Sequence, residues 1–110
     1  MSIDQTRTVD FITFDRKSGD VWLTVSDHLP WDQEEGKHLL LLQEKLNAYL
    51  EFIEGGQIFT ECPDAEGRNI VIDVVGVYPL SQQAKRFYEL ATTATRDAGF
   101  NLQFRLRHSI

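Results

Sequence analysis

Carboxylate and imidazole side chains crowd one segment of this 110-residue sequence. The segment runs from Asp27 to His38, and we call it the link. Its ionisable groups are Asp27, His28, Asp32, Glu34, Glu35, Lys37 and His38. Because carboxylate oxygens and imidazole nitrogens bind divalent cations and transfer protons, the link could hold a metal ion or a small ligand, or act in acid–base catalysis.

The spacing of these groups argues against chemistry at the link. The sequence contains neither HxxxH nor HExxH there. Acidic residues ahead of a helix stabilise its positive end, and Asp32 with Glu35 resembles a capping box. We therefore predict no metal, no cofactor and no catalytic residue. The candidate binding residues of the link are Asp27, His28, Trp31 and His38.

Asp73 is a further candidate, because it interrupts an otherwise apolar run at residues 69–77. A buried ionised carboxylate is costly unless it is paired. Asp73 is therefore either a site acid that faces a pocket or an outward residue on a sheet face open to water, and we favour the second. We expect an apolar surface on that face, of the kind that marks a partner or dimer interface. Its members would be Trp22, Ile12, Phe14, Val71 and Val75.

Nucleophilic catalysis has no sequence signature here. GxSxG, Walker and GxGxxG motifs are absent. Cys62 is the single cysteine and precedes Pro63 at a predicted turn. A reactive thiol needs a neighbouring base or a helix N-terminus, and the sequence indicates neither. We interpret Cys62 as a neutral structural thiol.

Hydrophobic periodicity predicts seven elements. Apolar residues spaced three and four apart predict a helix that follows Asp32 and ends at Gly55 and Gly56, and a second helix between Ser81 and Gly99. The first helix has an apolar stripe of Leu39, Leu42, Leu46, Tyr49, Leu50 and Ile53. Shorter apolar or alternating runs predict strands at residues 9–15, 21–26, 57–61, 69–77 and 102–107.

This order, ββαββαβ, predicts an α+β fold. We expect a two-layer sandwich in which two helices pack on one face of a mainly antiparallel, five-stranded sheet. The length predicts a single domain over residues 1–110.

Charge and hydropathy exclude some functions. The chain has 17 acidic and 11 basic residues, a net charge of −6, which opposes nucleic-acid binding because that needs clustered Lys and Arg. No apolar run approaches the roughly 20 residues of a membrane-spanning helix. The N-terminal residues do not resemble a secretory signal, so we expect a cytoplasmic protein.

Three segments resemble a family of small bacterial domains of unknown function. They are VWLTVSDHLPW from Val21 to Trp31, HLLLLQEKLNAYLEFIEGGQI from His38 to Ile58, and CPDAEGRNIVIDVV from Cys62 to Val75. The resemblance covers nearly the full chain and implies a cytosolic bacterial protein with this α+β layout. It implies no catalytic residues, cofactor or substrate.

Two functional hypotheses follow. The first is a non-catalytic binding or interaction protein, either a homodimer through the open sheet face or a binder through the link around Trp31. The alternative is an enzyme or a small-ligand or metal binder that uses the Asp27–His38 link, with Asp73 or Glu61 as a possible carboxylate partner.

Overall fold

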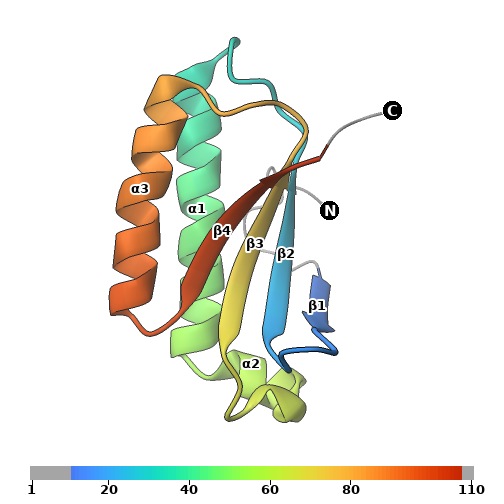
Figure 1. Cartoon of the computed structure of the whole chain (residues 1–110). Coiled ribbons are helices and arrows are strands. Elements are labelled where there is room, and N and C mark those ends of the chain that lie inside the picture. The colour runs from blue at the N-terminus through green and yellow to red at the C-terminus, as the bar shows by residue number, and fades with distance from the viewer. Residues whose placement is uncertain (1–10, 108–110) are drawn as a thin grey trace.

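A four-stranded mixed sheet forms one layer of the protein (Figure 1). The computed structural model describes residues 11–107, and of Phe11 the backbone only. The strands are β1 (Phe11–Phe14), β2 (Val21–Asp27), β3 (Ile70–Gly76) and β4 (Asn101–Leu106), and they lie in sequence order across the sheet. β1 pairs antiparallel with β2, whereas β2, β3 and β4 run parallel.

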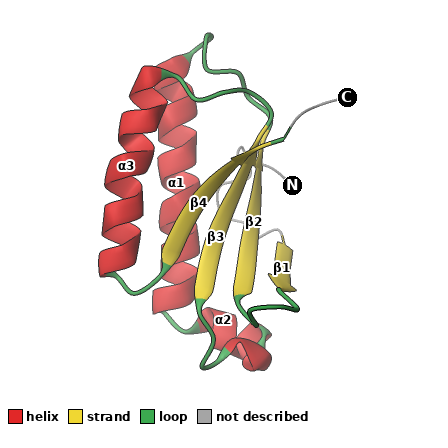
Figure 2. Ribbon diagram, in the orientation of Figure 1, coloured by secondary structure: helices red, strands yellow, loops and turns green. Residues whose placement is uncertain are grey.

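The helices form the second layer. α1 (Glu35–Glu54) connects β2 to β3, and α3 (Gln82–Asp97) connects β3 to β4. Parallel strands joined by a helix are connected in the right-handed sense, and both connections here step in the same direction across the sheet. They therefore place α1 and α3 on the same face (Figure 2). A short helix α2 (Gln57–Glu61) and a 3-10 turn, η1 (Pro63–Ala65), lie between α1 and β3.

The predicted α+β class and the two helices on one face are confirmed, but the five-stranded, mainly antiparallel sheet is wrong. Residues 57–61 form α2, because Gly56 adopts a left-handed conformation with φ 81° and starts a new helical turn that buries Ile58. α1 has already carried the chain back to the end of the sheet at which β2 begins. The next strand is β3, which therefore runs parallel to β2. Of the first predicted strand, residues 9 and 10 lie outside the described range.

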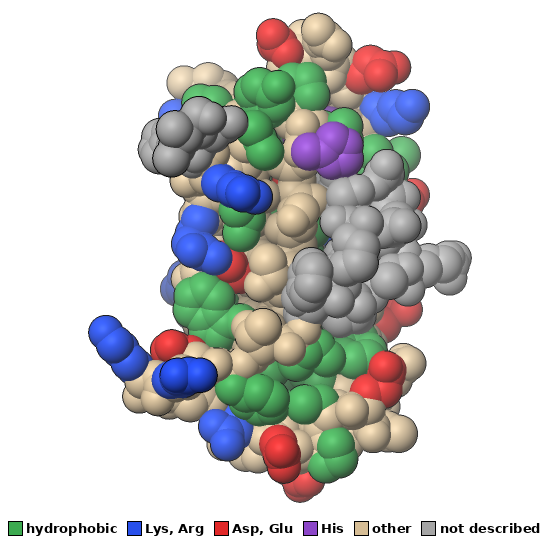
Figure 3. All heavy atoms as spheres, turned by 90° about the vertical axis from the view of Figure 1, so that its right-hand side faces the viewer, with side chains coloured by type: hydrophobic (Ala, Val, Ile, Leu, Met, Phe, Trp, Pro, Cys, Tyr) green, Lys and Arg blue, Asp and Glu red, His purple; other side chains and the backbone are tan. Residues whose placement is uncertain are grey.

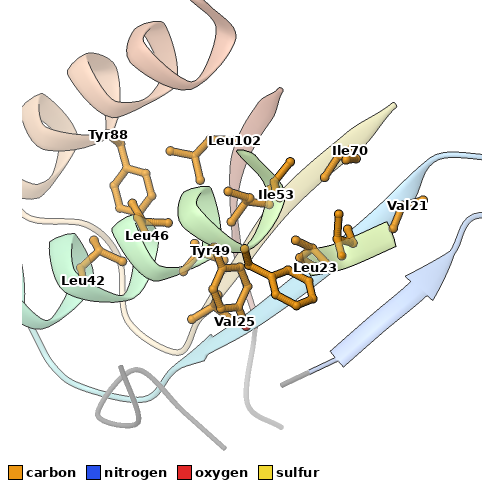
Figure 4. Packing of buried hydrophobic residues seen from close by; sticks show 14 of the residues in the cluster. Val21, Leu23, Val25, Leu42, Leu46, Tyr49, Ile53, Ile70, Tyr88 and Leu102 are labelled. Carbon is orange, nitrogen blue, oxygen red and sulfur yellow. The ribbon is translucent and has the colours of Figure 1, made fainter. Parts of the chain in front are cut away.

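One hydrophobic core fills the space between the layers (Figure 4). The predicted leucine stripe of α1 faces this core: Leu42, Leu46, Tyr49 and Ile53 are buried, and Leu39 and Leu50 are partly buried. The sheet contributes the alternate residues of each strand. They include Val21, Leu23, Val25, Ile70, Ile72, Val74 and Leu102. Among the described residues, no helix is both long and apolar enough to cross a membrane.

The opposite face of the sheet is mixed, and hydrophobic side chains lie there among basic and acidic ones (Figure 3). Trp22, Val71 and Val75 lie on it, but the placement of Ile12 and Phe14 there is wrong. Ile12 pairs with Leu23 and Phe14 with Val21, and directly paired residues point to the same face. Ile12 and Phe14 therefore lie on the helix side, because β1 is shifted by one residue from the expected register.

Gly76 tests the packing of the parallel strands. A methyl group at this position would lie 2.6 Å from Cε1 of Phe104, whose ring packs against Tyr88. We expect Gly76→Ala to lower the free energy of unfolding by about 1–3 kcal/mol because the ring must move. Gly36→Ala is the matched control: it meets no atom within 4 Å and should stabilise α1 by about 0.5–1 kcal/mol. Urea unfolding measures both free energies. A Gly76→Ala protein with the same free energy of unfolding as the wild type would contradict the close packing of Gly76 against Phe104.

Candidate functional site

Asp27 places a carboxylate at the carboxyl end of the parallel strands. It continues the inward alternation of Val21, Leu23 and Val25, so its side chain points into the helix layer with 2% of its surface exposed. One carboxylate oxygen, Oδ1, accepts a hydrogen bond from the backbone N–H of Leu29 at 3.1 Å. The carboxylate is therefore held at the point where the chain leaves β2.

His38 meets this carboxylate from the first turn of α1. Its Nε2 lies 2.8 Å from Oδ1 and 2.7 Å from Oδ2 of Asp27, and its Nδ1 lies 3.1 Å from the carbonyl oxygen of Pro30. A carbonyl oxygen can only accept, so Nδ1 must carry a proton. One further proton is then shared between Nε2 and the carboxylate. The buried pair has no net charge wherever that proton resides.

Trp31 closes the cluster. Its ring stacks on the imidazole of His38 with a centroid distance of 3.5 Å and an interplanar angle of 15°, and it is 6% exposed. The link is thus fixed to the protein through the Asp27 carboxylate, the Pro30 carbonyl and the Trp31 ring. His28 is exposed and does not join them.

Tyr88 approaches the cluster from α3. Its side chain extends toward α1 near Leu42 and Leu46 (Figure 4), and its buried hydroxyl has no hydrogen-bond partner among the described residues. Burial raises the pKa of the Tyr88 hydroxyl strongly, and the negative charge of Asp27 adds to the shift. The hydroxyl is therefore neutral. Burial also raises the pKa of Asp27, while the hydrogen bond and charge of His38 act in the opposite direction.

A half-open cleft of about 370 Å³ lies over this cluster. We call it the link cleft, and its lining residues are Leu29, Pro30, Gln33, Glu34, Lys37, His38 and Leu41. Glu34 precedes α1 in a left-handed conformation, with φ 48° and ψ 48°, and its side chain makes no capping hydrogen bond. The helix cap predicted at Asp32 is therefore wrong: α1 begins at Glu35, after the turn at Glu34.

The chemistry available at the link is limited. Both ring nitrogens of His38 are engaged and the ring is 2% exposed, so His38 offers no lone pair to a metal and no base to a substrate. Within residues 11–107, no group of three or more His, Cys, Asp or Glu side chains could hold a metal ion. The cluster gives the cleft a fixed floor instead.

Asp73 belongs to a separate cluster on the other face of the sheet. Its carboxylate accepts hydrogen bonds from Nε of Arg105 at 3.0 and 3.1 Å, from Nη2 of Arg105 at 2.6 Å, and from Nε2 of Gln103 at 3.0 Å. The Arg105 guanidinium also lies 5.5 Å from the ring centroid of Trp22. The face expected for Asp73 is confirmed, but the expected solvent exposure is wrong. Asp73 is 0% exposed because β4 places these partners beside it.

The six predicted site residues therefore divide into three sets. Asp27, Trp31 and His38 meet at the link. Trp22 and Asp73 lie on the opposite face and share Arg105 as a partner. His28 is exposed and acts on Asp27 through its charge, which opposes the rise that burial causes in the pKa of that carboxyl. Sequence reasoning missed Tyr88 and Arg105 as partners. Tyr88 shared the pattern of a core residue, and Arg105 could be matched to Asp73 only once the strand order was known.

Comparison with known proteins identifies a family but no activity. The model of the Family of unknown function (DUF6572) matches residues 1–108, and the chain belongs to that family. No curated protein and no solved structure gives a significant match. The predicted membership of a family of unknown function is confirmed, and the family assigns no role to any residue.

The raised pKa of Asp27 predicts a pH dependence of stability. The folded state binds this proton more tightly than the unfolded state, whose pKa is near 3.8. The stability that Asp27 contributes is therefore complete below that value and is lost as the pH rises through the raised pKa. We expect the free energy of unfolding of the wild type, minus that of Asp27→Asn, to fall with rising pH in this window.

Urea unfolding at closely spaced pH values measures this difference. Asp32→Asn is the matched control, because it removes an equal charge from an exposed position of the same link. The difference in the free energy of unfolding between the wild type and Asp27→Asn should not grow as the pH rises from 3.8. A growing difference would contradict burial as the dominant influence on the pKa of Asp27.

Proposed function

We propose that this member of a family of unknown function is a non-catalytic binding protein that holds its ligand or partner in the link cleft. The observation that carries the proposal is the state of His38. It forms part of the cleft lining, yet both of its ring nitrogens are bonded to the protein itself. The cleft therefore offers shape and side-chain contacts, and the imidazole of His38 is not available in it as a base.

Rigidity supports a binding role. The carboxylate of Asp27, the carbonyl of Pro30 and the ring of Trp31 fix the link against α1. Binding to a preformed surface avoids the entropy cost of ordering a loop. The cleft volume, about 370 Å³, lies in the range of about 300–1,000 Å³ that is common for ligand pockets.

The alternatives have less support. Acid–base catalysis or metal binding by His38 would require its ring to give up the Asp27 carboxylate or the Pro30 carbonyl. A homodimer through the open sheet face would have a smaller apolar surface than expected, because Ile12 and Phe14 face the other side. The Asp73 carboxylate on that face is already paired with Arg105.

We infer that the protein acts in the bacterial cytoplasm. The single cysteine, Cys62, is a free and partly buried thiol, which agrees with a reducing compartment. The resemblance to small bacterial domains supports the bacterial origin.

A fragment screen followed by amide NMR tests the proposed cleft. We expect small uncharged apolar fragments to shift the backbone amides of Leu29, Gln33 and Lys37. Leu41→Asp should weaken binding about tenfold or more, since about 1.4 kcal/mol of apolar contact corresponds to that factor. Leu40→Asp is the matched control, because Leu40 is the neighbouring leucine, is 54% exposed and does not line the cleft.

A second variant protects the test against misfolding. Gln33→Trp adds a large side chain at an exposed position of the cleft lining and should block fragments while the unfolding midpoint is retained. Fragments that bind only at the Trp22 face, or that bind Leu41→Asp and Leu40→Asp equally well, would overturn the proposal.

A further inference from the structure

We propose that the link cleft receives an apolar side chain presented by a basic segment of a partner protein. This inference rests on the proposed function and specifies the partner by its chemistry. Two observations carry it: the apolar residues among the cleft walls with further apolar surface at this end of the molecule, and the acidic residues of the link beside the cleft.

The walls of the cleft suit one apolar side chain. Leu29 and Leu41 are partly buried and belong to the apolar shell around the core. The backbone N–H of Val77 donates to the carbonyl of Asp27 at 3.1 Å, so the exposed pair Val77 and Tyr78 leaves the sheet beside the link. Apolar surface at this end therefore extends beyond the cleft, as a protein partner requires.

The cleft adjoins an acidic stretch of the link, of which Glu34 lines the cleft. Asp32, Glu34 and Glu35 lie within four residues, and the carboxylates of Asp32 and Glu34 are exposed. None of the three side chains makes a hydrogen bond or an ion pair with any part of the chain that the structure describes. The capping role that would explain acidic residues here is therefore not fulfilled by their side chains. Opposite charge on a partner would be attracted over about 10 Å at 0.1 M salt.

The net charge of the whole chain favours the same partner. A formal charge of −6 draws basic segments to the protein before contact, which raises the association rate more than the final affinity. Among the described residues that line the cleft, Lys37 is the one lysine or arginine. It opposes a basic partner, so its replacement by an acid should strengthen binding.

Synthetic peptides test this inference directly. The probe is KKKFKKK, with acetylated and amidated ends, and its controls are KKKAKKK and EEEFEEE. Amide NMR titration of the full chain reports both the site and the affinity. We expect KKKFKKK to shift the amides of Leu29 and Leu41 and to bind at least about fivefold more tightly than either control, with an affinity that falls as salt is added.

Three variants distinguish binding of the peptide at the cleft from its attraction to acidic surface elsewhere on the protein. Glu34→Lys should weaken binding of KKKFKKK at least about threefold, and Lys37→Glu should strengthen it by a similar factor. Glu51→Lys, which makes the same charge change at an exposed position of α1 away from the cleft, should leave the affinity nearly unchanged. All three positions are exposed, so the fold should be retained.

Several outcomes would overturn the inference. Equal binding of KKKFKKK and KKKAKKK would show attraction to acidic surface without insertion of a side chain. Equal binding of EEEFEEE would show apolar binding without charge preference. Concentration-dependent dimerisation that Glu34→Lys abolishes would make a second copy the occupant. If uncharged fragments occupy the cleft but KKKFKKK does not, the basic partner is wrong and the proposed function stands; if nothing occupies the cleft, both are wrong.

Discussion

Asp27 and His38 bring the end of β2 and the first turn of α1 to hydrogen-bonding distance, and the intervening link folds over them. Neither group could be buried alone, because an unpaired charge or an unsatisfied ring nitrogen in the core is costly. Together with the N–H of Leu29 and the carbonyl of Pro30, the pair has its polar atoms satisfied. The position of Trp31, the start of α1 and the floor of the link cleft all depend on this contact.

The parallel arrangement of the strands explains why the site lies at this end. Asp27 pairs with Gly76 at the carboxyl ends of β2 and β3. Because these two strands run parallel, the loops that follow them leave the sheet at the same end. The second buried carboxylate, Asp73, lies mid-strand on the other face and is neutralised by Arg105. It contributes to the sheet and is remote from the loops that shape the cleft.

Long periodic segments of this fold could be predicted from the sequence, and short ones could not. The stripe from Leu42 to Ile53 repeats over a 20-residue helix, so its buried face was unambiguous. Residues 57–61 are too few for periodicity to separate a strand from a helix, and that single error added a fifth strand to the predicted sheet. Asp27, Trp31 and His38 were all candidates, but their mutual contact depends on how the link folds. Tyr88 showed only the pattern of a core residue.

Nitrogen-15 NMR of the imidazole rings tests the central claim, that His38 is locked between Asp27 and Pro30. His28 is exposed and provides the internal reference. We expect a proton on Nδ1 of His38 that exchanges slowly with water, while the ring protons of the exposed His28 exchange rapidly. An unprotonated Nδ1 on His38, or exchange as fast as that of His28, would contradict the account.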